Sequence, residues 1–259
     1  CEQSDLNIAV YGLHGDAPHL VVAPNSIGDC VFTTQWAVHL AEHMQTAAIV
    51  LSDQAMGQSR AIIDRPADLA FMARRLTATA VEGEAYQRYK LTANGISPMA
   101  IPGTPGCMYT SDGLEHNERG TPSSTASDHQ KQMDKRLRKV MLHDYGNHWA
   151  DIEGEGDIAV ITWGSVTSPC VEAVERLTAK GAKIKLISLR LLLPALPEKL
   201  HAELAGVTKL LVVEQTHGAQ FHKYLRAHYE LPETVDVLNR PGPLPIRPQE
   251  VETRLAAWM

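Results

Sequence analysis

Residues 158–170, with the sequence IAVITWGSVTSPC, decide the fold of this chain. Their first five residues form a short apolar run that is typical of a strand. Gly164 and Ser165 then provide a turn, and Ser168 and Pro169 begin a helix, because proline is favoured at the first helical position. The stretch therefore predicts a strand, a turn and a helix that ends near Gly181.

The same alternation continues toward the end of the chain. Apolar runs at 183–189 and 209–213 predict two more strands, and residues 197–204 and 217–228 predict two more helices. Three successive β-α units imply a parallel sheet that is covered on both faces and has right-handed crossovers. We expect residues 151–259 to fold as a domain of the α/β class.

An earlier part of the chain repeats this pattern. Residues 20–23 (LVVA) predict a strand, residues 27–44 a helix with apolar residues at helical spacing, and residues 47–51 (AAIVL) a buried parallel strand. Polar residues follow the two strands: Asn25, Ser26, Ser52, Asp53 and Gln54. Open α/β sheets bind ligands at the carboxyl ends of their strands, so we expect a ligand crevice there.

Residues 96–129 join the two halves and are rich in glycine, proline, serine and threonine, with neither a helical nor a strand period. Loops of this length in compact domains are functional or disordered. Two prolines restrict residues 101–106 (IPGTPG), and residues 113–120 (GLEHNERG) gather ionisable and amide groups. We expect an ordered, functional loop that packs near Asn25 and Asp53, and a solvated interdomain linker is the alternative.

The charge balance argues against a nucleic-acid-binding protein and against one that binds an acidic membrane. The 24 Lys+Arg and 30 Asp+Glu give a net charge of -6, so no overall basic field exists. One local run, within a predicted helix, is basic: Lys131, Lys135, Arg136, Arg138 and Lys139. Such a run is usually a solvated helix face, and a docking surface for an acidic partner is the alternative.

The four cysteines, Cys1, Cys30, Cys107 and Cys170, lack the close spacing that holds zinc or an iron–sulfur cluster, so any cluster is expected on another chain. No apolar run approaches the roughly 20 residues that cross a bilayer, and the first thirty residues do not resemble a signal peptide. We therefore expect a cytoplasmic protein. The start at Cys1 without methionine predicts that these residues come from a longer polypeptide.

Residues 39–43 (HLAEH) have the H-x-x-E-H form of a zinc hydrolase, which offers a different chemistry. The two histidines lie one helical turn apart, and Glu115 or Glu118 could be a further ligand. The same histidines fall on one helix stripe with Phe32 and Trp36, and this arrangement favours packing over metal binding. Serine-hydrolase, phosphate-binding and dinucleotide-binding patterns are absent.

Several blocks occur along nearly the whole chain: residues 2–6 (EQSDL), 12–18 (GLHGDAP), 51–54 (LSDQ), 89–92 (YKLT), 94–98 (NGISP), 101–106 (IPGTPG), 113–118 (GLEHNE), 161–165 (ITWGS) and 213–215 (VEQ). In sequence and in order they resemble the α-subunit of the 2-oxoacid:ferredoxin oxidoreductases, above all the 2-oxoglutarate type. This resemblance is far more specific than any single motif above.

The resemblance implies an α/β fold with an incomplete pyrimidine-type domain that binds thiamine diphosphate, in residues 1–150, and a transketolase C-terminal-like parallel α/β domain in residues 151–259. It implies CoA-dependent oxidative decarboxylation of a 2-oxoacid. Thiamine diphosphate supplies the carbanion chemistry, and electrons pass through a 4Fe–4S cluster to ferredoxin. The thiamine pyrophosphate, Mg²⁺ and the cluster are expected on a β-subunit.

Members of the family carry, before the block that matches residues 2–6, a segment that contacts the aminopyrimidine ring and contains the glutamate that activates thiamine. Without it we expect no catalytic residue, no metal site and no activity in this chain alone; the N-terminal α segment and the β-subunit would be needed. A non-catalytic structural subunit is the alternative. The candidates for support of the active site, each with turn or cap hydrogen bonding as the alternative role, are Asp53, Gln54, Gly103, Thr104, Gly106, His116, Asn117 and Glu118.

Overall fold

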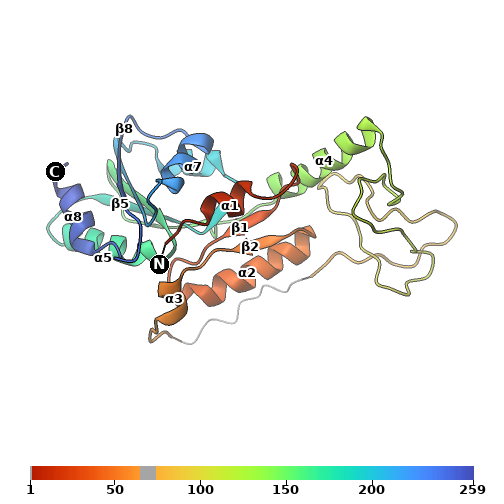
Figure 1. Ribbon diagram of the computed structural model, residues 1–259, viewed down its shortest axis with the longest axis horizontal. Coiled ribbons are helices and arrows are strands. Elements are labelled where there is room, and N and C mark those ends of the chain that lie inside the picture. Colours follow the sequence, from red (N-terminus) through yellow and green to blue (C-terminus); the bar gives the residue numbers. More distant parts are fainter. Residues whose placement is uncertain (1, 65–73) are drawn as a thin grey trace.

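The computed structural model describes residues 2–64 and 74–259, so Cys1 lies outside the described residues. Its strands form one sheet of three strands and one of five (Figure 1). The strands are β1 (Leu20–Val22), β2 (Ala48–Val50), β3 (Ala150–Glu153), β4 (Ile158–Trp163), β5 (Ile184–Leu189), β6 (Leu191–Leu193), β7 (Lys209–Glu214) and β8 (Thr234–Asn239). The helices are α1 (Leu6–Tyr11), α2 (Asp29–Met44), α3 (Gln54–Gln58), α4 (Ala126–Met141), α5 (Thr167–Thr178), α6 (Pro197–Glu203), α7 (Gln220–His228) and α8 (Pro248–Ala256). The expected α/β class is confirmed.

The five-stranded sheet has the order β3-β5-β4-β7-β8. Every residue of the central strand β4 is buried, and the 3-10 turn Gly164–Val166 leads directly from it into α5. Buried residues of α5 and α8 pack in one core, and those of α6 and α7 pack in the other, so both faces are covered as predicted. The edge strand β3 was not predicted. It runs antiparallel to β5, and its sequence, ADIE, contains no apolar run.

The three-stranded sheet has the order β2-β1-β6. β1 pairs in parallel with β2, as predicted, and antiparallel with β6, which comes from the C-terminal half. A single core of buried residues includes both halves of the chain. The expectation that residues 47–51 are buried is wrong for β2, since this strand lies at the sheet edge and Val50 is 39% exposed.

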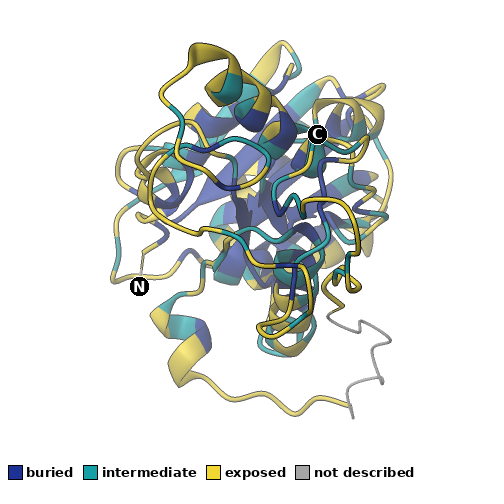
Figure 2. Cartoon of the chain, turned by 90° about the vertical axis from the view of Figure 1, so that its right-hand side faces the viewer, coloured by how far each residue is buried: buried dark blue, intermediate teal, exposed yellow. Residues whose placement is uncertain are grey.

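Residues 76–141 form an arm, made of loops and α4, that extends away from the two sheets (Figure 1). Hydrogen bonds hold its loops together, for example from the Tyr86 hydroxyl to the carbonyl of Pro98 (2.7 Å) and from the amide of Tyr89 to the carbonyl of Glu118 (2.8 Å). Figure 2, viewed from the arm's side, shows exposed loops in front and buried strands behind them. Within residues 2–64 and 74–259, no helix is both long enough and apolar enough to span a bilayer.

Candidate functional site

Polar side chains from both sheets meet where β1, β2, β4 and β7 end. A small cleft of about 300 Å³, open to solvent, lies at this point. Because parallel strands direct their carboxyl ends to one edge of a sheet, the position agrees with the crevice expected from the sequence. Its lining residues are Glu2, Gln3, Asp5, Leu51, Ser52, Asp53, Met56, Trp163, Gly164 and Ser165.

Asn25, which follows β1, joins the two sheets behind this cleft. Its side chain is buried, and its amide nitrogen donates to Asp151 Oδ2 and to the carbonyl of Ser188, each at 3.0 Å. Its amide oxygen accepts from the backbone amide of Gly164 at 3.3 Å and lies 3.5 Å from the hydroxyl of Thr167. All of this bonding capacity is used inside the protein, so Asn25 holds the cleft wall in place.

A buried arginine strengthens the same joint. Arg190 lies between β5 and β6, and its guanidinium pairs with Asp29 at 3.0 Å and with Asp151 at 2.6 Å. Burial lowers the pKa of Arg190, but bonds and attraction from Asp151 and Asp29 outweigh that effect and raise the pKa above its ordinary value. The sequence analysis did not predict a role for Arg190. Its position as the one charged residue in the mainly apolar stretch 186–193 could have indicated a buried ion pair.

Gln3 connects the N-terminal segment to the ends of β4 and β7. Its side chain donates to the carbonyl of Trp163 at 2.6 Å and accepts from the amide of Gln215 at 2.7 Å. Gly164 has a φ of 68°, and a Cβ added there would lie 2.8 Å from Gln3 Nε2. This close approach accounts for glycine after β4, within a stretch that the sequence marked only as a turn.

Asp53 lies at the cleft, where it caps α3. Its carboxylate accepts from the amide of Met56 at 3.1 Å and from the hydroxyl of Ser165, which comes from the other sheet. Gln54 is the first residue of α3 and is exposed. Both predicted residues are therefore at this edge, and the observed bonds of Asp53 are of the capping kind.

The cleft does not fit the diphosphate of a thiamine cofactor. Three acidic residues, Glu2, Asp5 and Asp53, line it, and their charges would repel phosphate groups. In the described part of the chain, no three histidine, cysteine, aspartate or glutamate residues are grouped so that they could hold a metal ion. The chemistry that this edge supports is hydrogen bonding and shaping of a site wall.

The loop candidates lie elsewhere, on the arm and far from α3 (Figure 1). Gly106 packs on the backbone of Val81, whereas a Cβ added to the exposed Gly103 would meet no other atom within 4 Å. The Thr104 hydroxyl donates to the carbonyl of Ile101 at 2.7 Å. The expectation that the loop packs near Asn25 and Asp53 is wrong for this chain, because the loop bonds to other parts of the arm and, through the carbonyl of Ser97, to Gln45 at the end of α2.

The second group of loop candidates surrounds Tyr89. His116 is buried and stacks on the Tyr89 ring with a centroid distance of 3.7 Å. The Asn117 side chain accepts from the amide of Arg119 at 3.0 Å, and Glu118 accepts from the amide of Leu91 at 2.7 Å. These are turn and cap hydrogen bonds, the alternative role considered for these residues.

The H-x-x-E-H motif is not assembled into a metal site. The rings of His39 and His43 stack at 6.0 Å, and Glu42 pairs with Arg75 at 2.7 Å. Burial by itself would raise the pKa of Glu115, but hydrogen bonds from Arg136 and then from a neighbouring histidine lower this pKa to about 2. Glu115 thus belongs to the arm, as does Glu118, and neither is grouped with the two histidines in the described structure.

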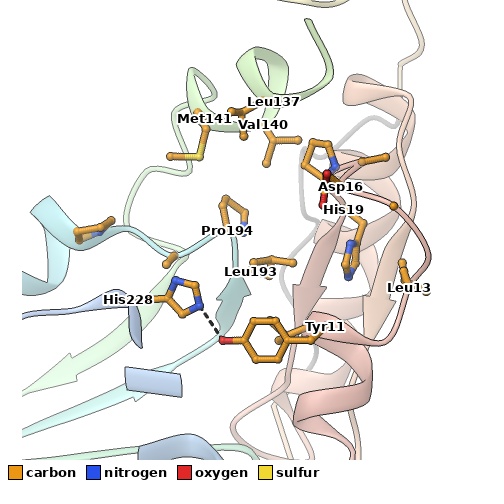
Figure 3. A pocket seen from close by; sticks show the side chains of 16 residues that line it. Tyr11, Leu13, Asp16, His19, Leu137, Val140, Met141, Leu193, Pro194 and His228 are labelled. Carbon is orange, nitrogen blue, oxygen red and sulfur yellow. Dashed lines mark hydrogen bonds between the residues drawn. The ribbon is translucent and has the colours of Figure 1, made fainter. Parts of the chain in front are cut away.

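A larger, mainly apolar pocket of about 1170 Å³, open to solvent, lies at the base of the arm (Figure 3). Leu137 and Met141 of α4 form one wall, and Tyr11 and His228 form another. The Tyr11 hydroxyl and His228 Nε2 share a hydrogen bond of 2.8 Å. No motif in the sequence indicated this pocket, because its walls come from four segments that are far apart in the chain.

Comparison with known proteins gives two family matches. Residues 1–135 match the model "Pyruvate flavodoxin/ferredoxin oxidoreductase, thiamine diP-bdg", and residues 147–226 match "Transketolase, C-terminal domain". The chain is 28% identical, over 98% of its length, to the 2-oxoacid:ferredoxin oxidoreductase subunit alpha of Saccharolobus solfataricus. It is 29% identical, again over 98% of its length, to the 2-oxoglutarate synthase subunit KorA of Methanothermobacter marburgensis.

Among solved structures, the 2-oxoglutarate:ferredoxin oxidoreductase of Magnetococcus marinus with 2-oxoglutarate, coenzyme A and succinyl-CoA bound is similar over 99% of this chain, with a TM-score of 0.85 and 34% identity. The chain spans 45% of that protein chain. It spans 41% of the S. solfataricus subunit and 67% of the M. marburgensis subunit.

Proposed function

This chain belongs to the pyruvate flavodoxin/ferredoxin oxidoreductase family of thiamine-diphosphate-binding proteins, and on that premise we propose that it is part of the α-subunit of a 2-oxoacid:ferredoxin oxidoreductase. The proposed reaction is CoA-dependent oxidative decarboxylation with electron transfer to ferredoxin. We further propose 2-oxoglutarate as the substrate. The observation that carries this proposal is the likeness, over nearly the whole chain, to a solved enzyme that holds 2-oxoglutarate and coenzyme A.

We propose that the cofactors are held outside these residues. Thiamine diphosphate supplies the carbanion chemistry of such reactions when it is bound. The acidic cleft near Asp53 offers no cation for its diphosphate, and the described residues offer no ligand group for Mg²⁺ or a 4Fe–4S cluster. A β-subunit and the thiamine-contacting α segment are the proposed sources of these sites.

The proposed role of this chain is to hold one wall of the active site in a fixed position. Asn25 bonds to Ser188 of the other sheet, Arg190 pairs with Asp29 of α2, and Gln3 connects the N-terminal segment to both β4 and β7. Such buried and satisfied polar networks make an arrangement rigid. Asp53, which lines the cleft, and its exposed neighbour Gln54 are the candidates for contact with groups that other segments supply.

The open edge of β2 supports an assembly. Val50 is 39% exposed, and the outer edge of β2 has no neighbouring strand among the described residues. A free edge presents unpaired backbone groups that favour pairing with another strand. We propose that residues 1–150 are the later part of a pyrimidine-binding domain that other strands complete there, and that residues 151–259 form the second domain.

A second candidate is a structural subunit without a catalytic role. One observation favours it. Polar side chains at the cleft already make hydrogen bonds within the chain, as Gln3 and Asp53 do. Under this alternative the cleft would stabilise an assembly and contribute nothing to turnover.

Co-expression tests these proposals. The chain, extended by the upstream α segment and combined with the β-subunit, should reduce a dye in a reaction that requires 2-oxoglutarate, coenzyme A and thiamine diphosphate. The chain alone should show no such activity. Within the active assembly, Asp53→Asn should lower kcat, whereas Asp112→Asn on the exposed arm should not.

Each result distinguishes the candidates. Activity with another 2-oxoacid alone would overturn the substrate and leave the reaction standing. A stable assembly that is inactive with every 2-oxoacid would favour the structural subunit. Equal kcat in the two aspartate variants would remove Asp53 from the supporting residues.

A further inference from the structure

A cluster of two buried cations and one half-buried cation lies in the arm, away from the cleft. It is formed by Lys135 and Lys139 of α4 and by Arg88 of the preceding loop. Lys135 is 7% exposed and Arg88 is 8% exposed. The sequence favoured a solvated helix face for this basic run, and that interpretation is wrong for Lys135, which points into the protein.

Two of the three cations have partners at the end of α2. Lys139 donates to the carbonyl of Gln45 at 2.9 Å, and Arg88 donates to the side-chain oxygen of the same residue at 2.7 Å. Gln45 has a φ of 50° and caps the helix, so its carbonyl faces outward from the helix end. Cations are favourable at this end of a helix dipole.

Lys135 has no such partner. In the described part of the chain its ammonium makes no hydrogen bond and no ion pair, and it lies over the Tyr89 ring at 5.9 Å from the centroid. The nearby Arg136 already has an acidic partner, because its guanidinium donates two hydrogen bonds, of 2.9 and 2.8 Å, to the carboxylate of Glu115. The Lys135 ammonium is not fully enclosed, since it is not one of the buried side-chain nitrogens that lack a hydrogen-bond partner among the described residues. It can therefore accept a partner from outside the chain.

Burial of the Lys135 side chain and the neighbouring cations disfavour the charged form of its ammonium. Burial first, and then repulsion from Lys139, Arg88 and Arg136, lower the pKa of Lys135 to about 7. Burial and the two arginines likewise lower the pKa of Lys139 to about 8. Among the described groups that act on Lys135, Glu118 is the acidic one, and it also accepts a hydrogen bond from the amide of Leu91.

We propose that Lys135, Lys139 and Arg88 form a binding site for an oxyanion, either a phosphate or a carboxylate group. Such a group would give the Lys135 ammonium its missing hydrogen-bond acceptor and would reduce the repulsion among the cations. Lysine binds phosphate as a compact point charge, and arginine provides planar donors that suit either group. The site is separate from the cleft and does not depend on the proposed reaction.

Thermal unfolding of the full chain at pH 7, at constant ionic strength, tests the proposal. Inorganic phosphate and acetate are each compared with chloride. A one-site ligand at 100 times its Kd should raise the Tm by about 5–10 °C. Acetate that reproduces the rise identifies a carboxylate site, which a side chain of a partner can fill, and a rise with phosphate alone identifies a phosphate site.

Lys135→Gln should abolish the rise. Lys131→Gln, which removes the same charge from an exposed position on the same helix, should keep it. If Lys135→Gln does not fold, NMR titration of the Lys135 ammonium in the unaltered chain replaces it, because bound anion must raise the pKa of that group.

Two results would overturn the site. One is a Tm that neither anion raises above its value in chloride. The other is a rise that persists in Lys135→Gln or occurs without any change in the Lys135 titration, because the anion would then bind elsewhere.

Discussion

Replacing Asn25 by alanine tests the joint between the two sheets. The substitution removes the donor to the Ser188 carbonyl and the acceptor for the Gly164 amide, both of which are buried. Each buried polar group left unsatisfied costs about 1–3 kcal/mol, so the free energy of unfolding should fall by about 2–4 kcal/mol. For a chain of this size that corresponds to a fall in Tm of about 5–12 °C.

Two further variants make the test specific. Asn25→Asp places a carboxylate beside Asp151 and should destabilise more than alanine at pH 7. Repulsion and burial would raise the folded-state pKa of the new carboxyl above its unfolded value near 3.9, so part of the loss should be recovered as the pH falls toward 4. The control, Asn7→Ala, changes an exposed residue of α1 and should alter stability by less than about 0.5 kcal/mol.

Urea denaturation followed by circular dichroism measures all three variants. A loss for Asn25→Ala no larger than that for Asn7→Ala would refute the reasoning, since it would mean that water or relaxation satisfies the groups that Asn25 now binds. A milder effect for aspartate than for alanine at pH 7 would refute the charge argument separately.

Three other predictions concern stability. Gly164→Ala should cost about 1–3 kcal/mol more than Gly206→Ala by urea denaturation, because both have positive φ but only the first lacks room for a Cβ. Arg190→Met should cost about 3–5 kcal/mol, since it leaves the largely buried Asp29 carboxylate without its ion-pair partner. Arg254→Met, which removes an ion pair that is largely exposed, should cost less than about 1 kcal/mol in the same assay. The pKa of Glu115 is lowered from 4.5 to about 2, so its stabilising contribution is complete above pH 4.5 and is lost as the pH falls toward 2. Tm measured from pH 7 to pH 2 should therefore show an advantage over Glu115→Gln that disappears at the acid end.

The local sequence determined most elements of the C-terminal half. Residues 158–170 predicted a strand, a turn and a helix, and the structure has β4, the turn after it and α5 there. The same reasoning located β5 and β7, because strands that are buried on both faces have nearly continuous apolar sequences. The order of the family blocks added the family itself, which no single motif could show.

Tertiary structure alone decided which distant residues meet. An apolar run does not reveal its pairing partner, so the sequence could not show that β6 joins β1 or that β2 lies at an open edge. It grouped the glycine-rich loop with Asp53 as parts of one site, but the structure places that loop on the arm.

The basic run of α4 shows the same division. Its charge and helical period could be read from residues 131–139, but the packing of Lys135 against Tyr89 depends on a loop more than forty residues away. Helical spacing specifies which side chains share a face, whereas the cost of a charge depends on what packs against that face. The local sequence thus determined the helices and strands. Packing between distant segments decided which polar side chains are buried and which of them lack a hydrogen-bond partner.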